Sequence, residues 1–164
     1  MPDRFTETQR LGQNPIVRVI MYVEPVLLGL IFLVVGLSSG PGAWLTLLLA
    51  WGACAVALPA LISRLTMTTL VTDQHLFVRW SWFFRKRVEL HAVTLAEPAR
   101  YDPISQAGGW GIKHSRKLGL VLNVFGDRGV AITAGDKRYM IGSQRPDELA
   151  EAILEGAIES SAQR

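Results

Sequence analysis

Two long apolar runs dominate the first third of the chain, separated by a short break rich in serine, glycine and proline. Residues 43–62 carry no charged side chain. About twenty helical residues, each rising about 1.5 Å, span a hydrocarbon core roughly 30 Å thick. The earlier run is continuously apolar only over 25–37, which is too short alone. It reaches a spanning length as 19–38, with Glu24 at the edge of the lipid. The pattern predicts a transmembrane helical hairpin over residues 14–63.

The residues before this hairpin have a different pattern. Residues 1–13 are polar and show no apolar period, so we expect a flexible N-terminal tail. Asn14 followed by Pro15 is a helix-start signal, because Asn accepts hydrogen bonds from first-turn amides and Pro at the first position loses none. Pro25 lies inside the predicted helix, where the missing N–H commonly produces a bend.

Small residues recur at helical spacing along both predicted helices. Close backbone approach at such residues replaces the hydrophobic drive that helices lack in lipid. We expect these faces to pack the hairpin together, and the alternative is an interface between copies of the chain. Trp44 is expected in an interfacial aromatic belt, and Trp51 in packing at mid-span. The small residues are Gly29, Gly36, Ala50, Ala53, Ala57 and Ala60.

After Arg64 the apolar positions alternate in short runs separated by turn residues, a pattern typical of β-strands. Gly and Asp in the breaks supply the positive φ angles and local hydrogen bonds of tight turns. Residues 64–164 are therefore expected to form one domain, an antiparallel barrel or sandwich of about seven strands. The candidate strands cover residues 67–71, 76–82, 85–90, 93–99, 111–115, 118–125, 130–133 and 138–141.

The chain ends in an amphipathic pattern over 146–160, with acidic residues on the polar side and in the first turn. This pattern predicts a helix that covers the open end of the sheet. Its apolar face is expected to contain Leu149, Ile153, Leu154, Ala157 and Ile158.

The distribution of charge also differs between the apolar hairpin and the residues that follow it. Between Arg64 and Lys117 nine basic residues face four acidic ones, although the whole chain has a net charge of only +3. Basic residues flank the hairpin on both sides, and the break between its two runs is uncharged. By the positive-inside rule, both termini face the cytoplasm and the protein is a multi-pass protein of the cytoplasmic membrane. A nucleic-acid role is disfavoured, because lipid headgroups compete for this basic excess.

Three stretches carry a resemblance to a known group. They are "LVTDQHLFVRW" at 70–80, "GGWGIKHS" at 108–115 and "YMIGSQRPDELAEAI" at 139–153. With the two preceding apolar runs, the pattern resembles the membrane-anchored bacterial pleckstrin-homology-like (PH-like) domain proteins. The resemblance implies an α+β membrane protein, in which a two-helix hairpin precedes a PH-like domain. It implies a membrane address and no activity.

The first candidate site is a set of aromatic residues flanked by bases at a predicted hairpin tip. Trp sits well at headgroup depth, and each base near an anionic leaflet gains about 1 kcal/mol. The tip is therefore a candidate membrane-interface or headgroup contact. Alternation allows a second interpretation, in which Val78, Trp80 and Trp82 share one core-facing side. The candidate residues are Arg79, Trp80, Trp82, Phe83, Phe84, Arg85, Lys86 and Arg87.

The second candidate site is the glycine-rich stretch Gly108, Gly109, Trp110 and Gly111, which follows a predicted long loop at 100–107. Glycines allow a sharp turn or the close approach of a partner. The stretch is therefore either a structural turn in which Trp110 plugs the barrel or a docking site for a partner.

A third stretch, 113–117, is a basic run around His114. It is either a solvated hairpin face or a site for an anionic headgroup.

No motif for catalysis is present. The chain contains no HExxH helix, and its one GxSxG spacing, at 36–40, ends an apolar run and is not a strand-to-helix elbow. Its one cysteine, Cys54, lies in an apolar run, and its three histidines are far apart in sequence. We therefore expect no catalytic residues, no cofactor and no metal. The expected function is a non-catalytic integral membrane protein whose cytoplasmic PH-like domain acts as a protein-interaction or membrane-surface-sensing module. Its expected partners are the lipid bilayer and either a protein partner or a second copy of the chain. The alternative is an accessory subunit of a transporter or of a lipid-acting membrane enzyme.

Overall fold

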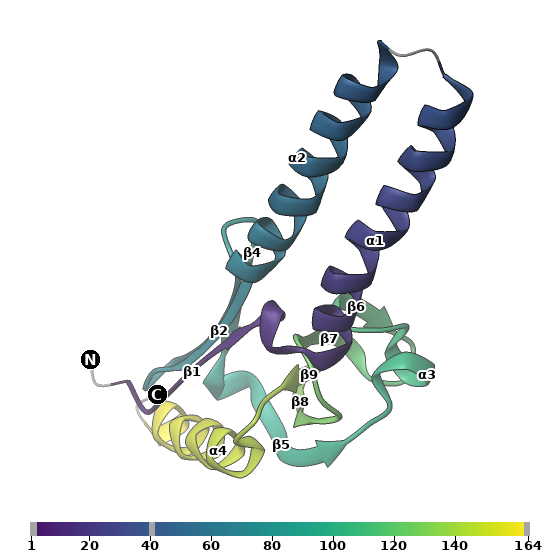
Figure 1. The fold of residues 1–164 in the computed structure, drawn as a ribbon. Coiled ribbons are helices and arrows are strands. Elements are labelled where there is room, and N and C mark those ends of the chain that lie inside the picture. Colours follow the sequence, from purple (N-terminus) through teal and green to yellow (C-terminus); the bar gives the residue numbers. More distant parts are fainter. Residues whose placement is uncertain (1–2, 40–41, 163–164) are drawn as a thin grey trace. The chain divides into compact units, whose positions relative to one another are not determined.

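The computed structural model describes residues 3–39 and 42–162, and it divides into two compact parts. One part is helical and comprises Arg10–Leu65. The other combines the residues up to Gln9 with those from Thr66 onward, and contains two sheets and two helices (Figure 1). The expected α+β fold, with two long apolar helices and a β-rich region, is confirmed.

The helical part contains the 3-10 turn η1 (Leu11–Gln13) and the helices α1 (Pro15–Ser38) and α2 (Ala43–Arg64). Both helices are long and apolar enough to cross a membrane. As predicted, Asn14 caps α1, since its side chain accepts hydrogen bonds from the amides of Ile16 and Val17 at 2.9 and 3.3 Å. The predicted break between the apolar runs includes residues 40–41, which lie outside the described residues.

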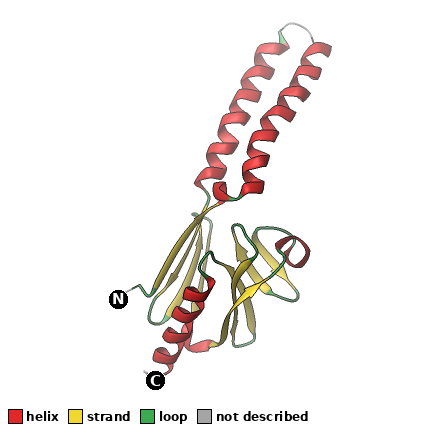
Figure 2. Ribbon diagram, turned by 60° about the horizontal axis from the view of Figure 1, so that its bottom comes forward, coloured by secondary structure: helices red, strands yellow, loops and turns green. Residues whose placement is uncertain are grey.

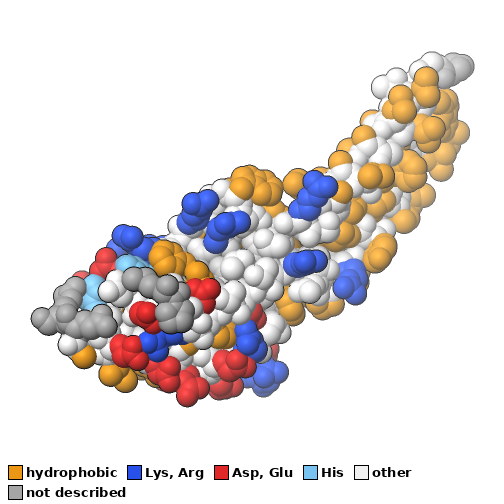
Figure 3. Space-filling view, turned by 90° about the vertical axis from the view of Figure 1, so that its left-hand side faces the viewer, with side chains coloured by type: hydrophobic (Ala, Val, Ile, Leu, Met, Phe, Trp, Pro, Cys, Tyr) orange, Lys and Arg blue, Asp and Glu red, His pale blue; other side chains and the backbone are white. Residues whose placement is uncertain are grey.

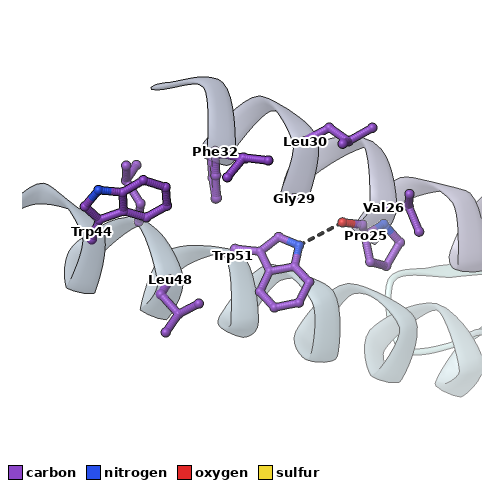
Figure 4. Close-up of a pocket in the computed structure, with 10 residues that line it drawn as sticks. Pro25, Val26, Gly29, Leu30, Phe32, Trp44, Leu48 and Trp51 are labelled. Carbon is purple, nitrogen blue, oxygen red and sulfur yellow. Dashed lines mark hydrogen bonds between the residues drawn. The ribbon is translucent and has the colours of Figure 1, made fainter. Parts of the chain in front are cut away.

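The contact between α1 and α2 is made by tryptophan rings seated on glycines. Trp51 lies against Gly29, and its indole N–H donates a hydrogen bond to the carbonyl oxygen of Pro25 at 2.7 Å (Figure 4). Trp44 lies against Gly36 in the same way. The prediction that Trp51 is a packing residue is confirmed.

The alanine side of α2 does not make this contact, contrary to the prediction. Ala50, Ala53, Ala57 and Ala60 are all exposed. Glycines on α1 provide the space at this contact and tryptophans on α2 fill it, so the alanines are not needed for it. Many large apolar residues of both helices are exposed, and on the face that Figure 3 draws apolar side chains gather over the helical part.

The glycine seats give a testable prediction. A methyl group at Gly36 would lie 2.8 Å from the ring of Trp44, whereas one at Gly52 would meet nothing within 4 Å. Gly→Ala in a helix interior is otherwise favourable by about 1 kcal/mol. Gly52→Ala should therefore maintain or raise the melting temperature of the full chain in detergent micelles, followed by far-UV circular dichroism, and Gly36→Ala should lower it. Equal shifts for the two variants would contradict this packing.

The β-rich part contains two sheets, drawn in yellow in Figure 2. In the described residues they comprise nine strands, more than the seven expected. The first sheet has the order β1-β2-β3-β4, with bounds Phe5–Arg10, Thr66–Val71, His75–Trp80 and Phe84–Glu89. The second has the order β5-β8-β9-β7-β6. In chain order, β5 to β9 cover Val93–Arg100, Gly111–Ser115, Gly119–Asn123, Arg128–Ala134 and Lys137–Gly142.

The N-terminal residues are not a flexible tail, so that prediction is wrong. Residues Phe5–Arg10 form β1, which pairs with β2. Its alternate residues Phe5, Glu7 and Gln9 are buried. Because two of these three are polar, the strand shows no apolar alternation in the sequence. The whole helical part is thus inserted between two neighbouring strands of one sheet.

Glu7 connects β1 to the chain segment that follows β9. Its carboxylate accepts hydrogen bonds from the Ser143 hydroxyl at 2.6 Å, the Gln144 amide at 2.9 Å and the Gln9 side chain at 3.1 Å. Gln9 also donates to the carbonyl oxygen of Gly142 at 3.0 Å. Buried polar groups of this kind are stable only when hydrogen-bonded. These bonds therefore hold the two sheets together at one end.

The second sheet is not wholly antiparallel, contrary to the prediction. Strands β7 and β9 run parallel, with Leu120 opposite Tyr139. Strand β8 pairs with β5 and β9, so β9 lies between β7 and β8. The turn predicted at 126–129 therefore does not close a hairpin, and the chain there passes from β7 to a strand that is not its neighbour.

The last helix, α4 (Pro146–Ala162), packs on β5, on β8 and on the 3-10 turn η2 (Leu90–Ala92). Leu149 and Ile153 are fully buried, as predicted. Leu154 and Ile158 are 42% and 71% exposed, so their assignment to the apolar face is wrong. Small residues take their place: Ala150, Ala152, Gly156 and Ser160 are buried on the packed side.

The buried carboxylate gives a second prediction. Glu7→Leu should lower the free energy of unfolding of the β-rich part by about 1–3 kcal/mol, because the Ser143 hydroxyl and the Gln144 amide lose their acceptor. Chemical denaturation of the full chain in micelles, followed by tryptophan fluorescence, measures this loss. Thr6→Leu, on the exposed face of the same strand, is the control and should change stability by less than about 0.5 kcal/mol. Equal effects would mean that β1 contributes only general strand pairing.

Candidate functional site

The β3–β4 hairpin ends in a turn of Ser81, Trp82 and Phe83, which follows the paired residues Trp80 and Phe84. Ser81 has a positive φ of 44°. Its amide donates to the carbonyl oxygen of Thr66 at 2.7 Å, and its hydroxyl accepts from the Thr66 amide at 2.9 Å. The turn is therefore fixed to the first residue of β2.

The hairpin tip separates the aromatic residues that the sequence grouped together. Trp80 is only 4% exposed and belongs to the core, as the core interpretation predicted. Trp82 and Phe83 are 68% and 54% exposed, so that interpretation is wrong for Trp82. Their rings contact each other edge to face, with centroids 5.7 Å apart. Phe84 is half-buried. The tip therefore presents two large aromatic rings to its surroundings.

Arginines cover the outer face of the same hairpin. Arg79 lies opposite Arg85 in the strand register, and Arg87 lies opposite the partly exposed Phe77. Within the described residues, none of the three arginines forms an ion pair with a carboxylate. Like charges placed directly opposite each other destabilise a sheet. This face therefore favours an anionic partner.

Lys86 does not belong to this arginine face. It alternates with Arg85 and Arg87 along β4 and is half-buried. Its ammonium group lies 5.6 Å from the centre of the Tyr139 ring. The structure thus assigns Lys86 to a different surface from its neighbours.

The glycine-rich stretch follows a short helix, α3 (Pro103–Ala107), where a loop was expected. Asp102 caps α3 by accepting hydrogen bonds from the amides of Ile104 and Ser105 at 2.9 and 3.1 Å. Its hydrogen bonds with Ser105 and Ile104 lower the pKa of Asp102. Gly108, Gly109 and Gly111 all have positive φ angles, so glycine is required for this path of the backbone.

Trp110 is half-buried and does not plug a closed core. Its indole N–H donates to the carbonyl oxygen of Gly126 at 3.4 Å, in the crossing from β7 to β8. The aromatic residue buried near α3 is Tyr101, 5% exposed, which packs with Ala107, Val121 and Met140. The side-chain amide of Asn123 donates to the Tyr101 hydroxyl. The structural role predicted for Trp110 is therefore filled largely by Tyr101.

The basic run at 113–117 forms the β6–β7 hairpin, and its His114 is exposed. His114 and Arg116 line a cavity of about 450 Å³ together with residues of β4 and of the β8–β9 hairpin. The residues from the β8–β9 hairpin include Lys137 and Arg138, which sequence reasoning missed. They lie about twenty residues further along the chain, and only the parallel pairing of β7 with β9 brings the two hairpins together.

Chemically, the cationic and aromatic side chains of these surfaces can bind an anionic partner. In the part of the chain that the structure describes, no group of three or more His, Cys, Asp or Glu side chains could hold a metal ion. Cys54 lies half-buried in α2.

Comparison with known proteins yields no match to a family model, to a curated protein or to a solved structure.

Tyr101 gives a third prediction. Burial raises the pKa of Tyr101 above its ordinary value of 10.0. The unfolded chain therefore releases this proton first, so the stability due to neutral Tyr101 is complete below pH 10 and is lost as the pH rises further. Tyr101→Phe should reduce the slope of stability against pH in this range by about 1.4 kcal/mol per unit. Unfolding midpoints measured across this range test the effect, and parallel profiles for the two proteins would contradict it.

Proposed function

We propose that this chain is a non-catalytic integral protein of the cytoplasmic membrane, whose cytoplasmic PH-like domain senses the membrane surface through the Trp82–Phe83 tip. The observation that carries the proposal is the combination of two exposed aromatic rings with unpaired arginines on one hairpin. Aromatic rings favour headgroup depth, and arginines favour anionic lipid.

Chain connectivity supports a membrane role for this tip. Thr66, which is hydrogen-bonded to Ser81, is the second residue after Arg64, where α2 ends. The tip is therefore hydrogen-bonded, through Ser81, to a residue that lies two positions along the chain from the end of an apolar helix.

The energetics favour a reversible contact. Each arginine near an anionic leaflet contributes about 1 kcal/mol, and an aromatic side chain that becomes covered adds a comparable amount. Such a contact is too weak to hold a free domain on a membrane. It suffices for a domain already attached to the bilayer, because binding is then intramolecular. Occupancy of the contact would follow the charge of the leaflet, which is how the domain would sense it.

The PH-like assignment rests on the antiparallel four-stranded sheet, the second sheet and the C-terminal helix that packs on β5, η2 and β8. The parallel pair β7–β9 departs from an all-antiparallel barrel. The topology with both termini in the cytoplasm is supported by the basic residues Arg10, Arg18 and Arg64 beside the helices.

A spin label at the tip tests the proposal. Phe83→Cys in a Cys54→Ser background would carry the nitroxide, in full-length protein reconstituted into vesicles of phosphatidylcholine with or without phosphatidylglycerol. We expect the label to become more accessible to oxygen and less accessible to a water-soluble nickel chelate when phosphatidylglycerol is present. Arg79→Gln combined with Arg85→Gln should weaken this response.

The control is Ile104→Cys, an exposed position on α3, whose label should remain accessible to the chelate in both kinds of vesicle. If the label at residue 83 behaved like the label at residue 104, the tip would not contact the membrane and the proposed function would be wrong.

A further inference from the structure

A second basic surface lies on the opposite side of β4 from the arginine face. It is the cavity of about 450 Å³ introduced above, which we call the β4–β9 cavity. Its chemistry comes from six residues on three separate segments. These are Lys86, His114, Arg116, Lys137, Arg138 and Tyr139.

Basic residues outnumber acidic ones in the lining of the β4–β9 cavity. Four of its lining residues are lysine or arginine, and Asp136 is the one acidic residue among the described residues that line it. Among the described residues, none of the four cations forms an ion pair. The Arg138 guanidinium donates to the carbonyl oxygen of Arg116 at 3.0 Å, which orients it without reducing its charge.

The cavity is built by close packing of two hairpins. A side chain at Gly119 would lie 2.0 Å from the carbonyl oxygen of Arg138, so only glycine allows the β6–β7 hairpin to approach β9 this closely. Tyr139 is 6% exposed and lines the cavity, with the Lys86 ammonium 5.6 Å from its ring centre. The bases are thus attached to paired strands and their short turns.

We propose that the β4–β9 cavity binds a phosphate-bearing anion. Like charges gathered in a concave site repel one another and concentrate the positive field there, which attracts an anion. Arginine offers paired N–H donors that match phosphate oxygens, and lysine adds a compact charge. A volume of about 450 Å³ falls in the range of small-molecule sites. It exceeds one phosphate group, so a phosphorylated small molecule or a lipid headgroup fits.

This site is independent of the proposed membrane contact. Of the arginines of that contact, Arg85 and Arg87 alternate with Lys86 along β4 and lie on the other side of the strand, and Arg79 lies opposite Arg85 on β3. Loss of one site would therefore leave the other unchanged.

Isothermal titration calorimetry with inorganic pyrophosphate tests whether the β4–β9 cavity binds a soluble phosphate compound. The protein would be the full chain in phosphatidylcholine nanodiscs, with the variants Arg116→Gln and Lys137→Gln. Neither side chain forms a hydrogen bond or ion pair with another described residue, so the variants should fold normally. Each should raise the Kd for pyrophosphate about tenfold, because a charge-assisted hydrogen bond is lost. Arg128→Gln, an exposed change of equal charge at the far end of β8, should leave it unaltered.

Native mass spectrometry of protein released from nanodiscs containing phosphatidylglycerol tests the lipid source. If a headgroup occupies the cavity, wild type and Arg128→Gln should retain one more phosphatidylglycerol than Arg116→Gln and Lys137→Gln. Either result, pyrophosphate binding or lipid retention lost selectively in the two cavity variants, supports the site and identifies its source. The absence of both, or an equal effect of Arg128→Gln, would overturn the proposal.

Discussion

The pairing of β1 with β2 is the constraint on which the other features depend. It joins residues on either side of the apolar helices into one sheet. The buried carboxylate of Glu7 extends the same connection to the second sheet. Thr66 is the first residue of β2 and is also hydrogen-bonded to Ser81. The exposed tip is therefore attached to this sheet as well.

The elements that could be predicted from the sequence are those whose signals lie within a few neighbouring residues. The two apolar helices, the Asn14 cap and the β2–β3 and β3–β4 hairpins follow from patterns within a few residues, and the structure contains them. Strand β1 could not be predicted, because its inward side chains include Glu7 and Gln9. Their burial depends on partners more than a hundred residues away. The parallel pairing of β7 with β9 was hidden for the same reason, since no local signal specifies which strand will occupy a free edge.

The candidate sites show the same limit at the level of single side chains. A strand directs successive residues to opposite faces, so the basic run at the start of β4 serves two surfaces. Arg85 and Arg87 join Arg79 on the outside, and Lys86 joins residues from distant hairpins. The sequence pattern identifies the run as basic. It does not show which of these basic residues belongs to which surface, because that depends on which face of β4 the second sheet covers.

The insertion of the helices between β1 and β2 also affects how the protein is made. The ribosome releases β1 first, yet its partner strand emerges only after Arg10–Leu65 has been synthesised. Until then Phe5 and the polar residues beside it have no sheet to join. Completion of the domain therefore comes after completion of both helices, and a failure to place the helices would leave β2 as an open strand edge prone to aggregation. Maturation of this protein is thus ordered by its topology, with the domain closing last.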